Sequence, residues 1–363
     1  MNQSFSVIFP PDSPYRQLAH KLDSLPNRFP PADDESDLQL LAKLFTPREA
    51  DLTANLSEDY ETLQQISQRL DWNIGEVNTI LKDMSQKGLI SVGKTAQGRL
   101  GFKLLPFVVG IYENQLSRMD AELAQLFENY YTRAFGKALE KTPQFHRVIP
   151  VGKSLNKTLE IRPYESVYDL IDQAQAWAVG DCICRVQKSL IGEPCGHPLD
   201  VCLILSDQTH AFDGVAGIRV LNREEAIQTL QRAAEAGLVH TVSNNQKDIW
   251  YICNCCTCSC GILRGMVDLG IANVVAYAAY ISQVNQDLCI NCGECLPYCQ
   301  FGALVLTDTI QIIENRCAGC GICTTKCPQG ALSLIQRKDG IIPPLTSEDW
   351  RKARHHSTKH DLS

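Results

Sequence analysis

The chain has 363 residues, of which 44% are apolar and 21% charged, and it carries a formal net charge of −7. This composition is ordinary for soluble globular proteins, and the length allows two or three domains. A mildly acidic chain has no bulk attraction for nucleic acid or anionic lipid, which excludes general binding to either polyanion.

The apolar stretches of the chain give no membrane signal. The opening stretch MNQSFSVIFPPDSP lacks a basic n-region, so we expect no signal peptide. The longest weakly polar stretch, 271–284, is too short to span a bilayer. We therefore expect a cytoplasmic protein without an integral membrane segment.

Residues 1–107 contain no cysteine. Residues 1–35 are rich in Pro and Asp, and we expect a loosely packed N-terminal arm there. In residues 36–107, apolar side chains recur at helical spacing and a hairpin containing glycine follows. This order predicts a winged helix-turn-helix-like domain.

The helix expected at 74–88 would be the recognition helix of such a domain. Its charges cancel, since two cations stand against two anions: Lys82, Lys87, Glu76 and Asp83. The best basic cluster is in the wing, with Lys94, Arg99 and Lys103. DNA-reading helices usually carry a basic excess. We therefore do not expect DNA binding, and we favour a docking module or a homodimer interface.

Residues 108–284 form a helical and cysteine-rich region of expected α/β structure. Amphipathic helices are predicted at 112–140 and 164–178, and strands at 145–151 and 248–254. A further helix is expected to begin at an Asn222 cap and to end at Gly237.

Residues 285–336 hold two copies of one motif, and a polar tail follows at 337–363. The copies read CINCGECLPYCQFGAL and CAGCGICTTKCPQGAL. Each has the spacing C-x2-C-x2-C-x3-C of bacterial two-cluster ferredoxins, in which the fourth cysteine of one copy ligates the other cluster. We thus predict a two-[4Fe-4S] ferredoxin-like domain with two ligand sets. Site A is Cys289, Cys292, Cys295 and Cys327. Site B is Cys317, Cys320, Cys323 and Cys299.

The alternative for this repeat is a pair of zinc knuckles. Zinc sites stop at four ligands, and they leave the third cysteine and the three-residue gap unexplained. One residue departs from the ferredoxin pattern: Gln300 follows Cys299, where Pro is usual, whereas Pro328 follows Cys327. We expect this departure to change solvent access near site B and to leave ligation intact.

Nine further cysteines lie upstream in two groups. The first group is Cys182, Cys184, Cys195 and Cys202, and the second is Cys253, Cys255, Cys256, Cys258 and Cys260. Five free thiols within eight residues would oxidise readily, so their spacing favours metal ligation. It leaves open two further cubanes with one thiol left over, one larger or non-cubane cluster, or one cluster plus zinc.

Alternate residues of an extended stretch face opposite sides. Cys253 and Cys255 are then expected on one side of the stretch CNCCTCSC, and the other three cysteines on the other, so that the stretch serves two centres. For His197 we favour a surface or hydrogen-bonding role over ligation. Arg185 is a cation that could raise a cluster potential, bind an anionic substrate or form a structural salt bridge.

The stretches DCICRVQKSLIGEPCGHPLDVCLIL, EEAIQTLQRAAEAGLVH and ICNCCTCSCGILRG, together with the repeat, resemble a group of ferredoxin-type iron–sulfur proteins of anaerobic bacteria and archaea. The resemblance covers about nine tenths of the chain. It implies an α+β architecture of a winged-helix-like front, a cysteine-rich middle and a two-cluster ferredoxin, and it implies little about mechanism.

The leading hypothesis is an iron–sulfur electron-transfer protein that serves a redox partner protein or a larger oxidoreductase complex. Its cofactors would be two [4Fe-4S] clusters in the repeat and one or two iron–sulfur clusters upstream. No catalytic residue and no GxGxxG dinucleotide fingerprint stands out. The alternatives are a reductase with a catalytic upstream centre and a redox-sensing DNA-binding regulator.

Overall fold

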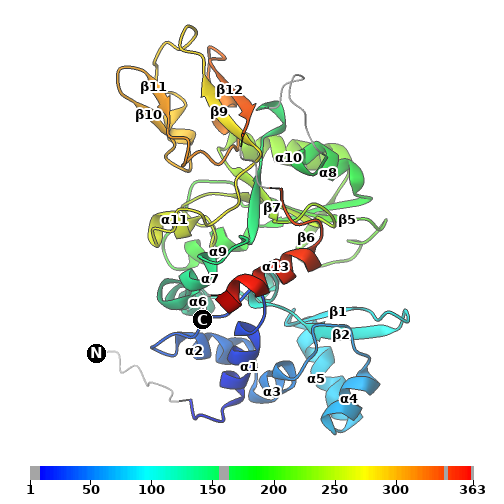
Figure 1. The fold of residues 1–363 in the computed structure, drawn as a ribbon. Coiled ribbons are helices and arrows are strands. Elements are labelled where there is room, and N and C mark those ends of the chain that lie inside the picture. The colour runs from blue at the N-terminus through cyan, green and yellow to red at the C-terminus, as the bar shows by residue number, and fades with distance from the viewer. Residues whose placement is uncertain (1–8, 155–162, 339–341, 361–363) are drawn as a thin grey trace. The chain divides into compact units, whose positions relative to one another are not determined.

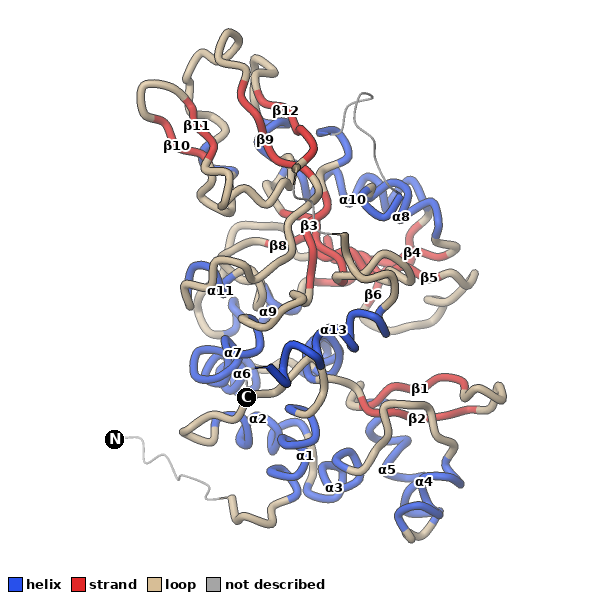
Figure 2. Tube along the Cα trace, in the orientation of Figure 1, coloured by secondary structure: helices blue, strands red, loops and turns tan. Residues whose placement is uncertain are grey.

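The computed structural model describes residues 9–154, 163–338 and 342–360 (Figure 1). The chain divides into two compact units, Met1–Ala138 and Leu139–Ser363. Both helix and sheet are present, as the sequence predicts (Figure 2). None of the described helices has the length and apolarity that a membrane span requires.

The first unit consists of helices and one hairpin. Its elements are α1 (Pro14–Asp23), α2 (Ser36–Leu44), α3 (Pro47–Ala54), α4 (Leu63–Leu70), α5 (Ile74–Gln86), β1 (Ile90–Lys94), β2 (Leu100–Leu104) and α6 (Ala121–Tyr130). The starts of α3 and α4 are fixed by capping boxes, in which Thr46 pairs with Glu49 and Thr62 with Gln65. The order of helices and hairpin is the one expected for 36–107, and its assignment as a winged helix stays a prediction.

The expected loose arm is wrong for its described part, because residues 9–35 are packed. Helix α1 begins at a Ser13 cap with Pro14 in its first turn, and it buries Leu18 and Leu22 completely or nearly so. Phe29 is fully buried as well. Apolar residues at i and i+4 behind a Ser-Pro start were the sequence signal for this helix.

The expected boundary between residues 107 and 108 also differs from the structure. Residues up to Ala138 belong to the first unit, since aromatic side chains bind the segment after β2 to the N-terminal residues. The ring centroid of Phe29 lies 4.7 Å from that of Phe107 and 4.5 Å from that of Tyr130. Aromatic pairs at such distances add to the apolar burial that holds one core together.

The second unit is built on a six-stranded sheet in the order β3-β7-β8-β5-β4-β6, with every neighbouring pair antiparallel. The strands are β3 (His146–Ile149), β4 (Ala176–Asp181), β5 (Asp200–Ser206), β6 (Ile218–Leu221), β7 (Val239–Ser243) and β8 (Tyr251–Cys255). Its helices are α8 (Val167–Gln173), α9 (Ile183–Leu190), α10 (Arg223–Glu235) and α11 (Arg264–Asp268), and α7 (Gly136–Leu139) lies at the limit between the units.

One face of this sheet is apolar and is covered by α8 and α10 (Figure 1). Leu203 and Leu205 of β5 and Ile252 of β8 are buried in that core. Because side chains alternate along a strand, the residues between them point to the opposite face. Cys202, Cys253 and Cys255 lie on that second face, which we call the thiol face of the sheet.

The ferredoxin-like repeat belongs to the same unit and consists of two small sheets. Strand β9 (Tyr280–Val284) pairs with β12 (Leu332–Gln336), and β10 (Leu304–Leu306) pairs with β11 (Ile310–Ile312), both antiparallel. Helix α12 (Ile322–Lys326) precedes Cys327. Because β9 pairs with β12, the last strand of the repeat, the ferredoxin-like part begins before the expected boundary at residue 285.

The expected polar tail, 337–363, contains helix α13 (Ser347–His360). This helix docks through residues four apart, because Trp350 is 8% exposed and Arg354 is fully buried. The Arg354 guanidinium lies over the Phe145 ring, 4.2 Å from its centroid. Helix α13 is therefore packed on the second unit through the face that carries Trp350 and Arg354.

Candidate metal centres

The repeat forms two cavities, each lined by four cysteines. The first has about 330 Å³ of empty space, part of it open to solvent, and it is lined by Cys289, Cys292, Cys295 and Cys327. The second has about 320 Å³ and is lined by Cys317, Cys320, Cys323 and Cys299. Each cavity thus takes three thiols from one copy and the fourth from the other, which is the composition expected for site A and site B.

Two glycines of the second copy lie so close to neighbouring residues that no side chain would fit there. Gly319 has φ +76°, and a Cβ atom on it would overlap the carbonyl oxygen of Tyr280 in β9. Gly321 has φ +72°, and a Cβ atom there would overlap the Ser154 side chain. Only glycine combines this left-handed conformation with the lack of a side chain. The loop of the second copy can therefore lie directly against β9 and the segment after β3.

Hydrogen bonds to sulfur repeat between the two copies. The N–H of Ala303 donates to Sγ of Cys299, and the N–H of Ala331 donates to Sγ of Cys327, each at 3.2 Å. The Ser282 hydroxyl also lies 3.2 Å from Sγ of Cys323. Such bonds stabilise thiolates and tune the potential of a bound cluster. Sequence reasoning missed Ser282, because its partner lies far away in the chain.

The donor set, the lining and the sulfur hydrogen bonds fit iron–sulfur ligation. Residues 288–331 match the family model of the 4Fe-4S dicluster domain. No curated protein matches the chain. The match covers the repeat alone, and with the cysteines it supports an iron–sulfur protein. The ligand assignment within sites A and B stays a proposal.

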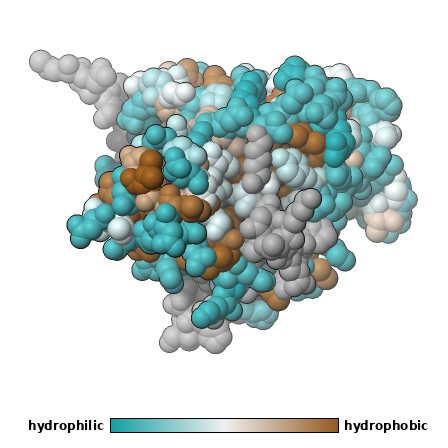
Figure 3. Space-filling view, turned by 90° about the horizontal axis from the view of Figure 1, so that it is seen from above, coloured by the Kyte–Doolittle hydropathy of each residue, from teal (hydrophilic) through white to brown (hydrophobic). Residues whose placement is uncertain are grey.

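Sites A and B differ in their surroundings. Cys292 of site A is exposed, and exposed apolar side chains of the repeat include Leu288, Ile290 and Leu306. Patches of apolar side chains also appear in the surface view from above (Figure 3). Site B is joined to the rest of the unit instead, since the N–H of Val151 donates to the Cys320 carbonyl at 2.9 Å. Site A thus faces outward and site B inward.

Six of the nine upstream thiols form a closed ring. Each contacts two others, in the order Cys182, Cys184, Cys260, Cys255, Cys253, Cys202 and back to Cys182. The sheet supplies three of them on its thiol face, and α9 with the residue before it supplies two more. We call this set the six-thiol ring. The Thr241 hydroxyl on β7 lies 3.3 Å from Sγ of Cys255.

The other three upstream thiols form a separate set. The sulfur atoms of Cys195, Cys256 and Cys258 all lie within 4.8 Å of one another. Cys256 is buried in the small core of Val201, Ala233 and Leu238, whereas Cys258 is exposed. We call this set the three-thiol site. It lies on the α10 side of the sheet, because Cys255 and Cys256 point in opposite directions.

The expected alternation along CNCCTCSC is therefore right for four cysteines and wrong for Cys260. Strand β8 ends at Cys255, and the following residues turn, so that the N–H of Cys260 donates to the Cys256 carbonyl at 3.1 Å. This helix-like turn returns Cys260 to the six-thiol ring. Alternation applies only to extended chain, and no residue pattern marked the end of this strand.

Arg185 is the cation between the two upstream sets. It is 2% exposed, and its guanidinium donates to the carbonyl oxygens of Pro198 (3.0 Å) and Asn254 (2.7 Å) and contacts Sγ of Cys256 at 3.7 Å. Among the described residues, no carboxylate pairs with it. Burial alone would lower its pKa, but electrostatic interactions with the sulfur atoms of Cys182, Cys256 and Cys202 raise it. A buried cation needs a counter-charge, and only sulfur provides one here.

His197 lies outside both sets, although it is close in sequence to Cys195. Its pKa is lowered by burial and by the charge of Arg185, against a hydrogen bond with the backbone of Ala236. Its ring nitrogens do not join the three close sulfurs. The non-ligating role that we favoured for His197 from the sequence stays a prediction.

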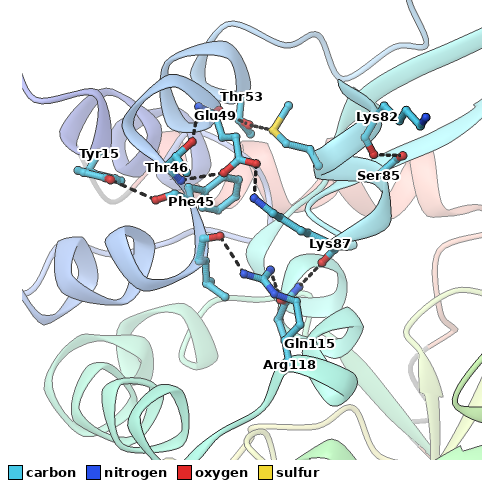
Figure 4. A network of polar contacts seen from close by, with 12 residues as sticks. Tyr15, Phe45, Thr46, Glu49, Thr53, Lys82, Ser85, Lys87, Gln115 and Arg118 are labelled. Carbon is cyan, nitrogen blue, oxygen red and sulfur yellow. Dashed lines mark hydrogen bonds and ion pairs between the residues drawn. The ribbon is translucent and has the colours of Figure 1, made fainter. Parts of the chain in front are cut away.

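Helix α5 of the first unit offers few free cations. Figure 4 shows the Lys87 side chain pointing toward Glu49. Its ammonium lies 2.6 Å from the Glu49 carboxylate, and the Glu49 side chain is 5% exposed. Glu76 pairs with Arg48 at 2.7 Å. Lys82 is exposed, but Asp83 lies beside it. The outer face of α5 therefore lacks the basic excess of a DNA-reading helix.

Proposed function

We propose that the protein transfers single electrons between a redox partner and an inner centre, with sites A and B holding [4Fe-4S] clusters and the six-thiol ring holding a further iron–sulfur cluster. Bound clusters would supply the one-electron chemistry. The observation that carries the proposal is the order of the thiol sets within one unit. Cys292 of site A is exposed, Cys320 of site B is hydrogen-bonded to Val151 after β3, and three members of the six-thiol ring lie on strands β5 and β8 of the sheet.

The chain's own residues hold and insulate these sites. The cavity of site A is lined by apolar side chains such as Ile310 and Leu332, and burial raises the pKa of Cys323 in site B to about 12. The free Cys323 thiol stays protonated at neutral pH, so ligation has to displace its proton. The N–H donors of Ala303 and Ala331 then face a thiolate at the fourth ligand of each site.

The exposed apolar residues near site A support a protein partner. Leu288, Ile290 and Leu306 are 50%, 63% and 42% exposed. Apolar side chains grouped beside an exposed ligand are typical of transient docking surfaces. We therefore place the docking surface for the redox partner at the site A end of the repeat. The homodimer expected through the first unit stays a prediction.

The direct experiment is anaerobic purification followed by stepwise chemical reduction. The expected result is a brown protein with more than about eight irons per chain, since sites A and B alone account for two four-iron clusters. Reduced protein should pass its electrons to a one-electron dye. A protein that holds iron but neither takes up nor gives electrons reversibly would defeat the proposal.

A redox-sensing DNA-binding regulator is tested by a separate experiment on DNA binding. The charge pairing of α5 argues against DNA binding, and a gel-shift titration with genomic fragments at low salt tests this point. Weak binding that salt abolishes would reflect charge alone. Specific binding that depends on the reduction state would favour a redox-sensing regulator instead.

A further inference from the structure

The three-thiol site differs in geometry from the other thiol sets. Among all described His, Cys, Asp and Glu side chains, only Cys195, Cys256 and Cys258 have three donor atoms within 4.8 Å of one another. The quartets of sites A and B, which match a cluster-binding family, do not bring three sulfurs so close. The sulfur atoms of the three-thiol site are therefore closer together than those of the two cysteine quartets in the repeat.

Tight spacing is what a single ion requires. A tetrahedral zinc ion with Zn–S distances of about 2.3 Å holds its sulfurs about 3.8 Å apart. In a cubane, each thiolate binds a different iron, so the body of the cluster separates the sulfurs. We propose that Cys195, Cys256 and Cys258 bind one zinc ion, so that the upstream cysteines serve one cluster and one zinc site.

The polar groups around the site support an anionic metal complex. Three thiolates and one Zn²⁺ carry a net charge of −1, and the buried Arg185 beside Cys256 supplies the opposite charge. The Ser259 hydroxyl is 1% exposed, contacts the Cys195 thiol and has no other hydrogen-bond partner among the described residues. A metal-bound thiolate is the acceptor that this hydroxyl lacks.

Zinc has no redox chemistry, so the site itself would not carry electrons. It would tie the loop after β8 to the loop that carries Cys195. Thr257, which contacts Gln300 of the repeat, stands between two of the ligands. A fourth ligand, which the described residues do not supply, would be a water molecule, since Cys258 lies at the surface. This inference does not depend on the electron-transfer role.

The test is the zinc and iron content of the full-length protein, purified anaerobically and passed over a chelating resin. We expect about one zinc per chain. Cys258→Ser should lose that zinc and keep its iron, and its fold should survive because the side chain is exposed. Cys195→Ser is a second variant with the same expectation. Cys292→Ser, an exposed cysteine of site A, is the matched control and should lose iron and keep zinc.

Two results would overturn the zinc site. One is a wild-type protein without zinc that also takes up no Zn²⁺ or Co²⁺ when either is added. The other is a Cys258→Ser variant that loses iron at unchanged zinc, which would place a cluster on the three thiols. Cobalt uptake with thiolate charge-transfer bands, absent in Cys258→Ser, would support the site independently. Neither of these two results would change the assignment of sites A and B, so the zinc site and the proposed function are tested separately.

Discussion

Gln300 accepts hydrogen bonds from the backbone N–H of Thr257 at 3.1 Å and from its hydroxyl at 2.9 Å. Its amide nitrogen donates to the Gly237 carbonyl at 3.2 Å. Gln300 follows Cys299 of site B, and Thr257 lies between Cys256 and Cys258. The residue that departs from the ferredoxin pattern therefore joins the repeat to the upstream thiols, which proline, with neither an amide side chain nor an N–H, could not do.

Gln300→Ala should loosen this junction. Three hydrogen bonds of about 0.5–1.5 kcal/mol each are lost, and we expect the free energy of unfolding of the variant to fall by about 1.5–4.5 kcal/mol. Hydrogen exchange in the peptides around Thr257 measures the local effect. Gln311→Ala, an exposed position on β11 of the same repeat, is the control. Equal exchange in both variants would mean that the Gln300 contacts contribute nothing.

The exchange of fourth ligands predicts which variants share a spectrum. Cys327→Ser should change the same cluster signal as Cys292→Ser, because both cysteines line the cavity of site A. Cys299→Ser should match Cys320→Ser, since both line the cavity of site B. Electron paramagnetic resonance of the reduced variants provides the comparison. If Cys327→Ser resembled Cys320→Ser, each copy would hold its own cluster.

The six-thiol ring predicts iron beyond the repeat. Cys253→Ser removes one ring member that contacts Cys202 and Cys255, and we expect a loss of iron with the signals of sites A and B intact. Iron analysis and resonance spectra of the same sample measure both effects. An iron content near eight, unchanged by Cys253→Ser, would limit iron–sulfur chemistry to the repeat.

Glu49 gives the first unit a pH dependence. Burial alone would raise the pKa of this carboxyl, but hydrogen bonds from Lys87 and Thr46 bring it below its usual 4.5. The stabilising contribution is therefore present above about pH 4.5 and is lost as the pH falls through the depressed pKa. Glu49→Gln should destabilise α3 and α5 by about 1–3 kcal/mol at pH 7, and by less in acid.

Hydrogen exchange of the peptides that cover α3 and α5 measures this difference within the first unit. Glu58→Gln changes an exposed carboxylate nearby and serves as the control. A Glu49→Gln effect that stayed constant from pH 7 down to about pH 2, below the depressed pKa, would show that the ion pair with Lys87 is not its source.

Local patterns in the sequence were enough to predict many of the helices and strands and the cysteines expected in sites A and B. Helix α10 begins at the predicted Asn222 cap, and the spacing of the repeat named the cysteines that line each cavity. Contacts between distant segments could not be predicted in this way. The partner of Gln300 depends on how the loop after β8 meets the repeat, and the place of Cys260 depends on where β8 ends. The packed α1 had a local signal, Leu18 and Leu22 behind Ser13-Pro14, which the Pro and Asp content obscured.

The most direct test of the central claim is the order in which the centres are reduced. Anaerobic protein is mixed with a one-electron protein donor, flavodoxin hydroquinone, and frozen at increasing times for electron paramagnetic resonance. We expect the signals of sites A and B, identified by the Cys292→Ser and Cys320→Ser variants, to appear first and the signal lost in Cys253→Ser to follow. Reduction of the upstream centre first, or at an unchanged rate in Cys292→Ser, would contradict entry of electrons through the repeat.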